Sequence, residues 1–269
     1  MKKLFQITQA NTECKEPFLC VRAGEKFFSF AIVDAGSQLL SSLYYYSVEK
    51  NEELQTEELI NLHPELKQGF RKVVVCHGCS MCMLFPSQNG FIEGGGKILD
   101  IFFGEDKSYV SLQEPIPGKE MTSYFKMPVK LNKWISEQFN NARIKAKESM
   151  LLCTLSDSTG QHIFLDFGND FFDSLILDER KILLSKSSDF SSHEDVLFWL
   201  LKVCELFNLP QEKIHLHISG LVDKQSSLYR SLYQYFINVE FREAKWKDDT
   251  NEYPAHFFTS LNDLYLCES

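Results

Sequence analysis

The densest group of side chains that could bind a metal ion lies between Cys76 and Cys82. Cysteine or histidine occupies four of these seven positions: Cys76, His77, Cys79 and Cys82. Thiolates and imidazoles in this density can bind zinc or copper. A structural zinc site usually draws its ligands from two such pairs, and no second Cys-x-x-Cys or His-x-x-x-His motif follows. We therefore expect ordinary strand and turn positions, with metal binding as the alternative that metal analysis would test.

Two further histidines, His215 and His217, alternate along an apolar run. Alternate residues of a strand share a face, so both imidazoles are expected on one side of a sheet. They could be ligands, but we favour local hydrogen bonding because no nearby carboxylate completes a site. The chain also lacks the Gly-x-Ser-x-Gly, Walker and His-Glu-x-x-His motifs, which removes the hydrolases that a short motif identifies.

The composition limits the possible partners. The 28 basic and 37 acidic side chains give a formal net charge of −9, which disfavours nonspecific binding to nucleic acid. A local basic run, Arg143, Lys145 and Lys147, is expected to be a solvated strand face. The sequence predicts neither a transmembrane segment nor an export signal. We expect a cytoplasmic protein whose eight cysteines are reduced thiols.

A chain of 269 residues is expected to form two domains, and an internal repeat supports this. Each copy reads as an apolar run, a glycine turn, a second apolar run, an Asp-containing turn and a third run, which predicts a three-stranded meander. Phe18–Ser42 and His162–Lys186 match without a gap at eight identical positions: Gly24/Gly168, Phe27/Phe171, Phe28/Phe172, Ile32/Ile176, Asp34/Asp178, Leu39/Leu183, Leu40/Leu184 and Ser41/Ser185.

Each meander is followed by a predicted helix and a further strand. Apolar residues at helical spacing predict helices over Glu52–Phe70 and Val196–Leu209. The second has a capping box of Ser192 with Asp195 and stops at Pro210. Short β runs follow at 73–76 and 214–218, and the second copy continues with a helix through 228–236 and a strand near 239–241. The repeating unit is therefore βββ-α-β.

The segment between the copies carries glycines and prolines that mark loops. It also contains a predicted strand at 124–127, a helix at 129–139 and a strand at 143–147. We expect a small inserted subdomain over about 91–148, within a first domain of 1–150. The second domain is expected over 151–269.

Three antiparallel strands followed by helix-crossover strands describe the ribonuclease-H-like unit, and two such units in tandem describe the actin-like ATPase fold. We therefore predict an α/β protein with an actin-like ATPase fold, made of two ribonuclease-H-like βββαβα units and a small inserted subdomain. Over nearly its full length the chain also resembles an uncharacterised family of bacterial proteins with this fold, to which no activity has been assigned. The segments that carry this resemblance are 18–46, 83–86, 124–139 and the tail from His256 to Glu268. It implies that the C-terminal segment 253–269 returns toward the first domain.

The resemblance also implies where a nucleotide would bind. In the actin-like ATPases, the turn between the first two strands of each copy cradles phosphates with backbone N–H groups, and an Asp there organises the metal ion. The second copy offers Asp166 and Gly168 at this turn, and the first offers Arg22 and Gly24. An arginine in the position of Asp166 could contact a phosphate, but it cannot coordinate Mg²⁺ or accept a proton.

The adenosine side of such folds usually contains a Gly-Gly step after a strand of the second copy, where Ser219 and Gly220 provide one glycine. An ordinary hairpin turn and an ordinary strand end are the alternatives at these positions. The candidate nucleotide-cleft residues are Arg22, Gly24, Asp166, Gly168, Ser219 and Gly220, and no catalytic or metal-binding residue is assigned.

Two functions remain open. The first, which we prefer, is a non-hydrolysing scaffold or regulatory module that binds an unidentified protein partner and is not an enzyme. The alternative is an ATP-binding or ATP-hydrolysing actin-like protein, with ATP and Mg²⁺ as its cofactors. A sugar or acetate kinase would need a catalytic carboxylate and substrate loops that we do not identify.

Overall fold

The computed structural model describes residues 1–9, 14–49, 56–87, 95–116, 118–155, 159–248, 250 and 252–268. The chain divides into two compact units. Unit 1 comprises Met1–Thr154, Trp246–Glu252 and Asp263–Ser269, and unit 2 comprises Leu155–Lys245 and Tyr253–Asn262. In the described part of the chain, no helix is long and apolar enough to cross a membrane.

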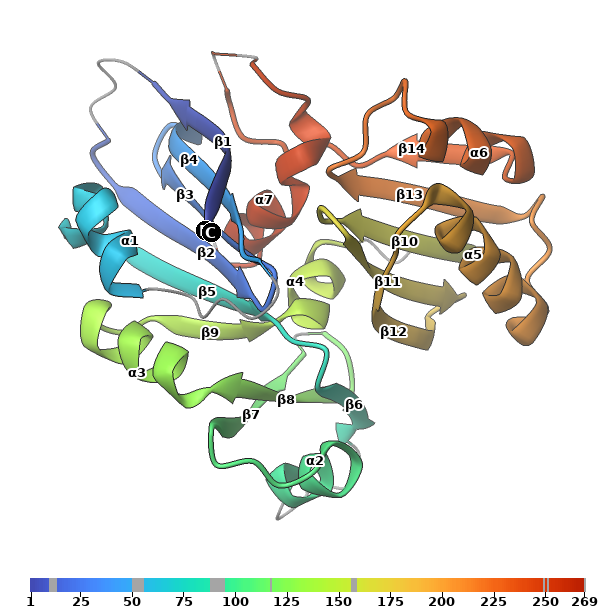
Figure 1. Ribbon diagram of the computed structural model, residues 1–269, viewed down its shortest axis with the longest axis horizontal. Coiled ribbons are helices and arrows are strands. Elements are labelled where there is room, and N and C mark those ends of the chain that lie inside the picture. Colours follow the sequence, from blue (N-terminus) through green and yellow to red (C-terminus); the bar gives the residue numbers. More distant parts are fainter. Residues whose placement is uncertain are drawn as a thin grey trace. The chain divides into compact units, whose positions relative to one another are not determined.

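Unit 1 is built on a six-stranded sheet of order β1-β4-β3-β2-β5-β9 (Figure 1). Its strands are β1 (Lys2–Thr8), β2 (Pro17–Gly24), β3 (Phe27–Asp34), β4 (Leu39–Ser47), β5 (Lys72–Gly78) and β9 (Arg143–Ala146). Strands β2, β3 and β4 form the predicted antiparallel meander. Strands β5 and β9 continue the sheet in parallel from β2, and β1 pairs antiparallel with β4.

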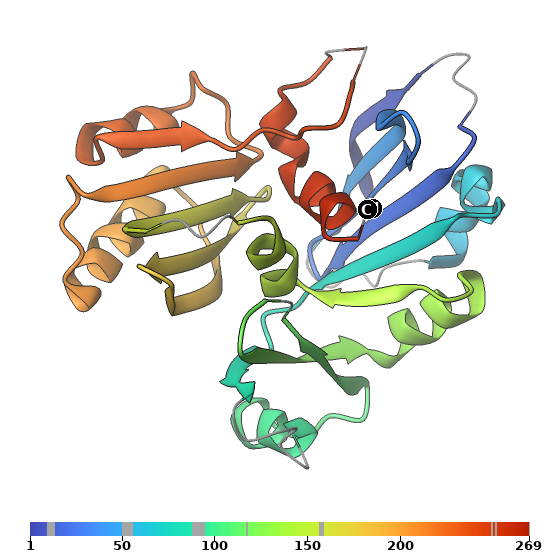
Figure 2. The same cartoon turned by 180° about the vertical axis from the view of Figure 1, so that it is seen from behind.

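One face of this sheet is covered by helices. They are α1 (Thr56–Leu62), the 3-10 helix η1 (Pro64–Lys67) and α3 (Val129–Gln138). Apolar side chains of these helices and of the strands form one core, which includes Leu19, Phe28, Phe30, Leu59, Val75, Leu131 and Trp134. On the opposite face lies the end of α7 (Thr259–Leu266) (Figure 2). There Tyr265 packs edge-on against Phe18, with 5.1 Å between ring centroids.

The helix predicted over Glu52–Phe70 is shorter and interrupted. Residues 52–55 lie outside the described part of the chain. The remainder forms α1 and η1, with the break at His63 and Pro64. Proline disfavours helical backbone in the residue before it and cannot donate a backbone hydrogen bond, so α1 ends there.

An insert between β5 and α3 forms a separate three-stranded sheet of order β6-β8-β7. It contains β6 (Cys82–Pro86), α2 (Gly95–Phe103), β7 (Tyr109–Pro115) and β8 (Met121–Pro128). This differs from the expected insert of about 91–148, because α3 and β9 belong to the main layer of unit 1. Strand β9 pairs in parallel with β5, and Trp134 and Ile135 of α3 are part of the main core. Sequence spacing does not show whether a strand belongs to the insert or to the main sheet, since parallel pairing joins strands far apart in the chain.

Unit 2 repeats the same topology in a five-stranded sheet of order β12-β11-β10-β13-β14. Its strands are β10 (Gln161–Phe167), β11 (Phe171–Asp178), β12 (Lys181–Asp189), β13 (Ile214–Gly220) and β14 (Asn238–Phe241). Helices α5 (His193–Phe207) and α6 (Ser227–Tyr235) cover one face of this sheet (Figure 1). The short η3 (Ala255–Phe258) follows β14 along the chain.

Helix α5 confirms the predicted capping signals. The Asp195 backbone N–H donates to Ser192 Oγ at 3.3 Å, and the Asp195 carboxylate accepts from the Ser192 backbone N–H at 3.0 Å. The helix ends at Phe207, and the C-cap residue Asn208 has a left-handed backbone with φ of 53°; Pro210 follows. Local sequence therefore sets both ends of this helix.

The two units confirm the predicted duplication. In each, the first strand of an antiparallel meander also pairs in parallel with the strand that follows the first helix. Both meanders even carry a register shift at equivalent positions, Ile32/Val33 and Ile176/Leu177. The two units therefore share their strand order, their strand directions and a local irregularity, which supports both the fold class and the duplication.

One part of the gapless match does not correspond in space. Asp34 pairs with Leu39 across a turn that is two residues longer than the turn between Asp178 and Lys181. The matches at Leu39/Leu183, Leu40/Leu184 and Ser41/Ser185 are therefore out of structural register. The longer turn is held by the Asp34 carboxylate, which accepts hydrogen bonds from the Ser37 backbone N–H at 3.1 Å and from its hydroxyl at 2.7 Å.

Candidate functional site

In unit 1, an aromatic ring packs against the glycines at the ends of β2 and β5, beside the turn that joins β2 to β3. Gly24 at the end of β2 pairs with Gly78 at the end of β5. The Phe27 ring lies against both glycines: an added Cβ would be 2.6 Å from the ring at Gly24 and 3.1 Å from it at Gly78. The guanidinium carbon of Arg22 lies 5.1 Å from the centroid of the same ring. Because Phe27 is only 3% exposed, its ring fills the space beside the glycine backbone.

The equivalent turn in unit 2 is filled in the same way. A Cβ at Gly168 would lie 2.1 Å from the ring of Phe171. The Gly168 backbone N–H donates to the carbonyl oxygen of Phe171 at 2.8 Å. One backbone donor of this turn is therefore used within the turn itself.

Asp166 lies beside this turn and holds three segments of unit 2 together. Its Oδ1 accepts a hydrogen bond from Ser219 Oγ at 2.9 Å, and its Oδ2 accepts one from Ser260 Oγ at 2.5 Å. These serines belong to β13 and to the first turn of α7. Both oxygens of the carboxylate are thus engaged by protein hydroxyls, which gives Asp166 a clear structural role.

Gly220 also has a structural requirement of its own. Its φ is +83°, and an added Cβ would lie 2.1 Å from the carbonyl oxygen of Phe167 on the neighbouring strand. Only glycine permits this backbone conformation and this close approach without strain. The close approach seen here is between two strands of the protein.

The six candidate residues predicted from the sequence fall into two groups. Arg22 and Gly24 lie together at the end of β2 in unit 1. The other four lie together at the ends of β10 and β13 in unit 2: Asp166, Gly168, Ser219 and Gly220. Strand pairing also supports the equivalence of Arg22 and Asp166, since they pair with Ser29 and Asp173 at matching positions of the second strands.

The structure places the cysteine and histidine cluster at the end of β5, at the start of β6 and in the turn between them. His77 is buried, and its Nδ1–H donates to the Ala23 carbonyl oxygen at 3.0 Å. Burial lowers the pKa of His77 to about 4, although this hydrogen bond opposes the shift. Burial raises the pKa of Cys79 to about 11 and that of Cys82 well above its ordinary value. Within the described ranges, no three His, Cys, Asp or Glu side chains are grouped so that they could hold a metal ion.

A hydrogen-bonded chain that sequence reasoning missed runs across β10, β13 and β14. His217 Nδ1 lies 2.7 Å from Glu240 Oε1, and its Nε2 lies 2.9 Å from Nδ1 of His162. The Phe164 ring stacks on His217 with 4.4 Å between centroids. Burial lowers the pKa of His217 to about 4, while Glu240 opposes this. The missed carboxylate lies on β14, and only the parallel pairing of His217 with Glu240 brings it there.

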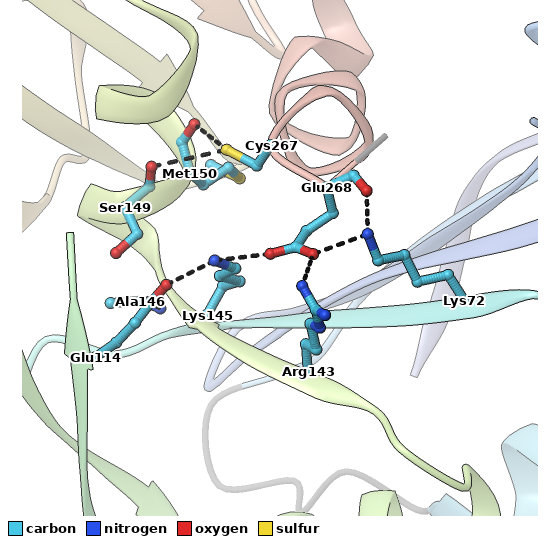
Figure 3. Close-up of polar contacts among 9 residues, drawn as sticks. All are labelled: Lys72, Glu114, Arg143, Lys145, Ala146, Ser149, Met150, Cys267 and Glu268. Carbon is cyan, nitrogen blue, oxygen red and sulfur yellow. Dashed lines mark hydrogen bonds and ion pairs between the residues drawn. The ribbon is translucent and has the colours of Figure 1, made fainter. Parts of the chain in front are cut away.

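A cluster of ion pairs in unit 1 is centred on the buried carboxylate of Glu268 (Figure 3). The Glu268 carboxylate lies 2.9 Å from Lys145 Nζ and 3.0 Å from Lys72 Nζ, and it also accepts from Arg143. Lys145 makes a second ion pair with Glu114 at 2.9 Å. The expected solvated face over Arg143, Lys145 and Lys147 is therefore wrong for the two lysines, each of which is 8% exposed. The physical reason for Lys145 is that two carboxylates compensate its burial.

Two units of this topology in one chain define the class: an actin-like ATPase fold. Several solved structures share it. A Bacteroides thetaiotaomicron protein with an actin-like ATPase fold and unknown function is 18% identical, with a TM-score of 0.74 over 94% of this chain and 96% of that one. The PilM-PilN type IV pilus biogenesis complex matches at 12% identity and a TM-score of 0.63, over 93% of this chain and 98% of that one. The cytoplasmic domain of Vibrio cholerae EpsL matches at 13% identity and a TM-score of 0.50, over 94% and 96%.

The family assignment is more specific. A family model described as "Protein of unknown function (DUF3822)" matches residues 7–239, and the chain belongs to this family. No curated protein matches the chain. The predicted resemblance to an actin-like family without an assigned activity is thereby confirmed.

Proposed function

We propose that this protein does not hydrolyse ATP and acts through protein contacts, as a scaffold or regulatory module. The absence of ATP hydrolysis is inferred from the aromatic ring at each turn where phosphates would be cradled. Phe27 in unit 1 and Phe171 in unit 2 both lie against the turn glycine. Each ring therefore occupies the space directly beside the glycine backbone, and we infer that it leaves less room there for a phosphate.

The charged residues beside these turns support the same proposal. Arg22 occupies the position equivalent to Asp166 and cannot organise a metal ion. Asp166 itself accepts hydrogen bonds from Ser219 and Ser260 through both oxygens. The described residues at the two turns thus fit ATP and Mg²⁺ poorly, and we derive no catalytic step through them.

Protein contact is the remaining way in which we expect such a chain to act. The fold is compatible with protein contact, since a similar fold occurs in the PilM-PilN complex. Large apolar side chains also lie exposed at the end of α2, where Ile101 is 79% exposed and Phe102 is 65% exposed. Adjacent exposed apolar residues are common at contact surfaces.

Assays of ATP hydrolysis and of thermal melting, each with ATP and Mg²⁺ present, test the proposal that the protein does not use ATP. We expect no hydrolysis above the buffer rate and no change in melting temperature. A nucleotide present at 100 times its Kd would stabilise the folded protein by about 2.7 kcal/mol, which would raise the melting temperature by about 5–10 °C. Hydrolysis that is abolished by Asp166→Asn and preserved by Glu179→Gln would overturn the proposal. Glu179 is the control because it is exposed and lies at the opposite end of β10 and β11 from Asp166.

Affinity capture from the native cell tests the second half. The wild-type protein is expected to retain a partner that the Ile101→Asp variant loses. Leu206→Asp is the matched control, since Leu206 is 71% exposed on α5. Failure to capture any partner would contradict a scaffold role, and equal capture by the Ile101→Asp variant would exclude α2 from the contact.

A further inference from the structure

The last turn of α4 (Lys147–Thr154) and the end of the chain bring two cysteines together in unit 1. Cys267 Sγ lies 3.1 Å from the Met150 carbonyl oxygen and 3.8 Å from that of Ser149 (Figure 3). Cys153 is three and four residues further along the same helix. A helical side chain leans back over the preceding turn, so the Cys153 thiol lies over these carbonyls. The two side chains influence each other's pKa, which also places them close together.

The ion cluster at the chain end keeps this arrangement in place. Glu268, the residue after Cys267, is bound by Lys145 and Lys72, and its side chain is only 6% exposed. Lys145 lies on β9, which leads directly into α4. The same ion pairs therefore anchor both the segment that carries Cys267 and the start of the helix that carries Cys153.

The chemistry of the two thiols differs in a useful way. Interaction with the Cys267 side chain lowers the pKa of Cys153 to about 7; burial raises it, the charge of Lys145 lowers it, and the charges of Glu114 and Glu268 raise it. The pKa of Cys267 is raised, first by its interaction with the Cys153 side chain and also by burial and the nearby Asp263. A larger fraction of Cys153 is then thiolate at neutral pH than of an ordinary cysteine. Both residues are partly exposed, so a small reagent can reach them.

We propose that Cys153 and Cys267 form a reversible disulfide under oxidation, which fastens the end of the chain to α4. The oxidant is a hydroperoxide. The Cys153 thiolate attacks one peroxide oxygen: an S–O bond forms, the O–O bond breaks, and the other oxygen leaves as an alcohol or water after taking up a proton. The Cys267 sulfur then attacks the resulting sulfenic acid, the S–S bond forms, and the S–O bond breaks with loss of water. A small thiol reverses the reaction by exchange.

Peptide mass spectrometry of the full-length protein after hydrogen peroxide treatment tests this directly. We expect a cross-link between the peptides that contain Cys153 and Cys267, with loss of two hydrogens, and its disappearance on treatment with dithiothreitol. Cys153→Ser and Cys267→Ser should each abolish the cross-link. Cys14→Ser is the matched control and should preserve it, because Cys14 is also partly exposed but lies beside Asp34.

Alkylation kinetics provide a second readout that needs no oxidant. The rate at which iodoacetamide modifies Cys153 should rise with pH around a midpoint near 7, and the Cys267→Ser variant should react more than about tenfold more slowly at neutral pH. Serine is small and polar at a partly exposed site, so circular dichroism is expected to show native folding of each variant. The proposal is overturned if no cross-link forms, if Cys153 is oxidised without joining Cys267, or if another cysteine takes its place.

Discussion

Replacing Glu268 by glutamine is the substitution whose effect can be worked out most fully. The carboxylate lies among Lys145, Lys72 and Arg143 and is nearly inaccessible to solvent. Glutamine keeps the shape of the side chain and removes its charge. The substitution removes the ion pair of buried Lys145 with Glu268 and keeps its ion pair with Glu114.

The size of the effect follows from the pKa of Glu268. Burial alone would raise it, but hydrogen bonds and charges from Lys145 and Lys72 outweigh burial and lower it from 4.5 to about 2. This difference corresponds to about 3 kcal/mol of stabilisation. Because the folded pKa is below the unfolded one, the stabilisation is complete above the unfolded pKa of 4.5 and is lost as the pH falls through about 2. Glu268→Gln should therefore lower the free energy of unfolding by about 2–3 kcal/mol at neutral pH.

Urea denaturation followed by circular dichroism, from neutral pH into acid, measures this difference. The gap between wild type and Glu268→Gln should narrow steadily as the pH falls. Glu137→Gln is the control: its ion pair with Lys133 is 3.7 Å long, and the two side chains are 66% and 71% exposed, so it should cost less than about 0.5 kcal/mol. A gap as small as that of the control at neutral pH, or one that does not change with pH, would refute the electrostatic argument.

Two further predictions concern other parts of the chain. Gly220→Ala should destabilise unit 2 by more than about 3 kcal/mol, because of the positive φ and the clash of the added Cβ with the neighbouring strand. Gly69→Ala is the control and should change the melting curve little, since no atom lies within 4 Å of its added Cβ. Equal melting curves for the two variants would contradict this prediction. His77 should titrate by NMR near pH 4. Since its folded pKa is below the ordinary 6.5, stability should fall as the pH drops from 6.5 toward 4, and a ring that titrates near 6.5 would show that His77 is not buried.

The sequence alone was sufficient for the features that depend on neighbours along the chain. The meanders, the glycine turns with Phe27 and Phe171, and the capping box at Ser192 are all local patterns of residue type and spacing. The duplication followed because the same local pattern occurs twice. These features together predicted the fold class correctly.

Tertiary structure decided what lies between segments far apart in the chain. Glu240 meets His217, and Glu268 meets Lys145, only through strand pairing and the packing of the chain end. The assignment of β9 to the main sheet has the same origin. So does the filling of each glycine turn by its own phenylalanine, since a rotamer choice three residues away depends on the space that the surrounding core leaves. Spacing predicts which residues can meet locally, whereas burial and pairing over long separations determine which charges and rings actually do.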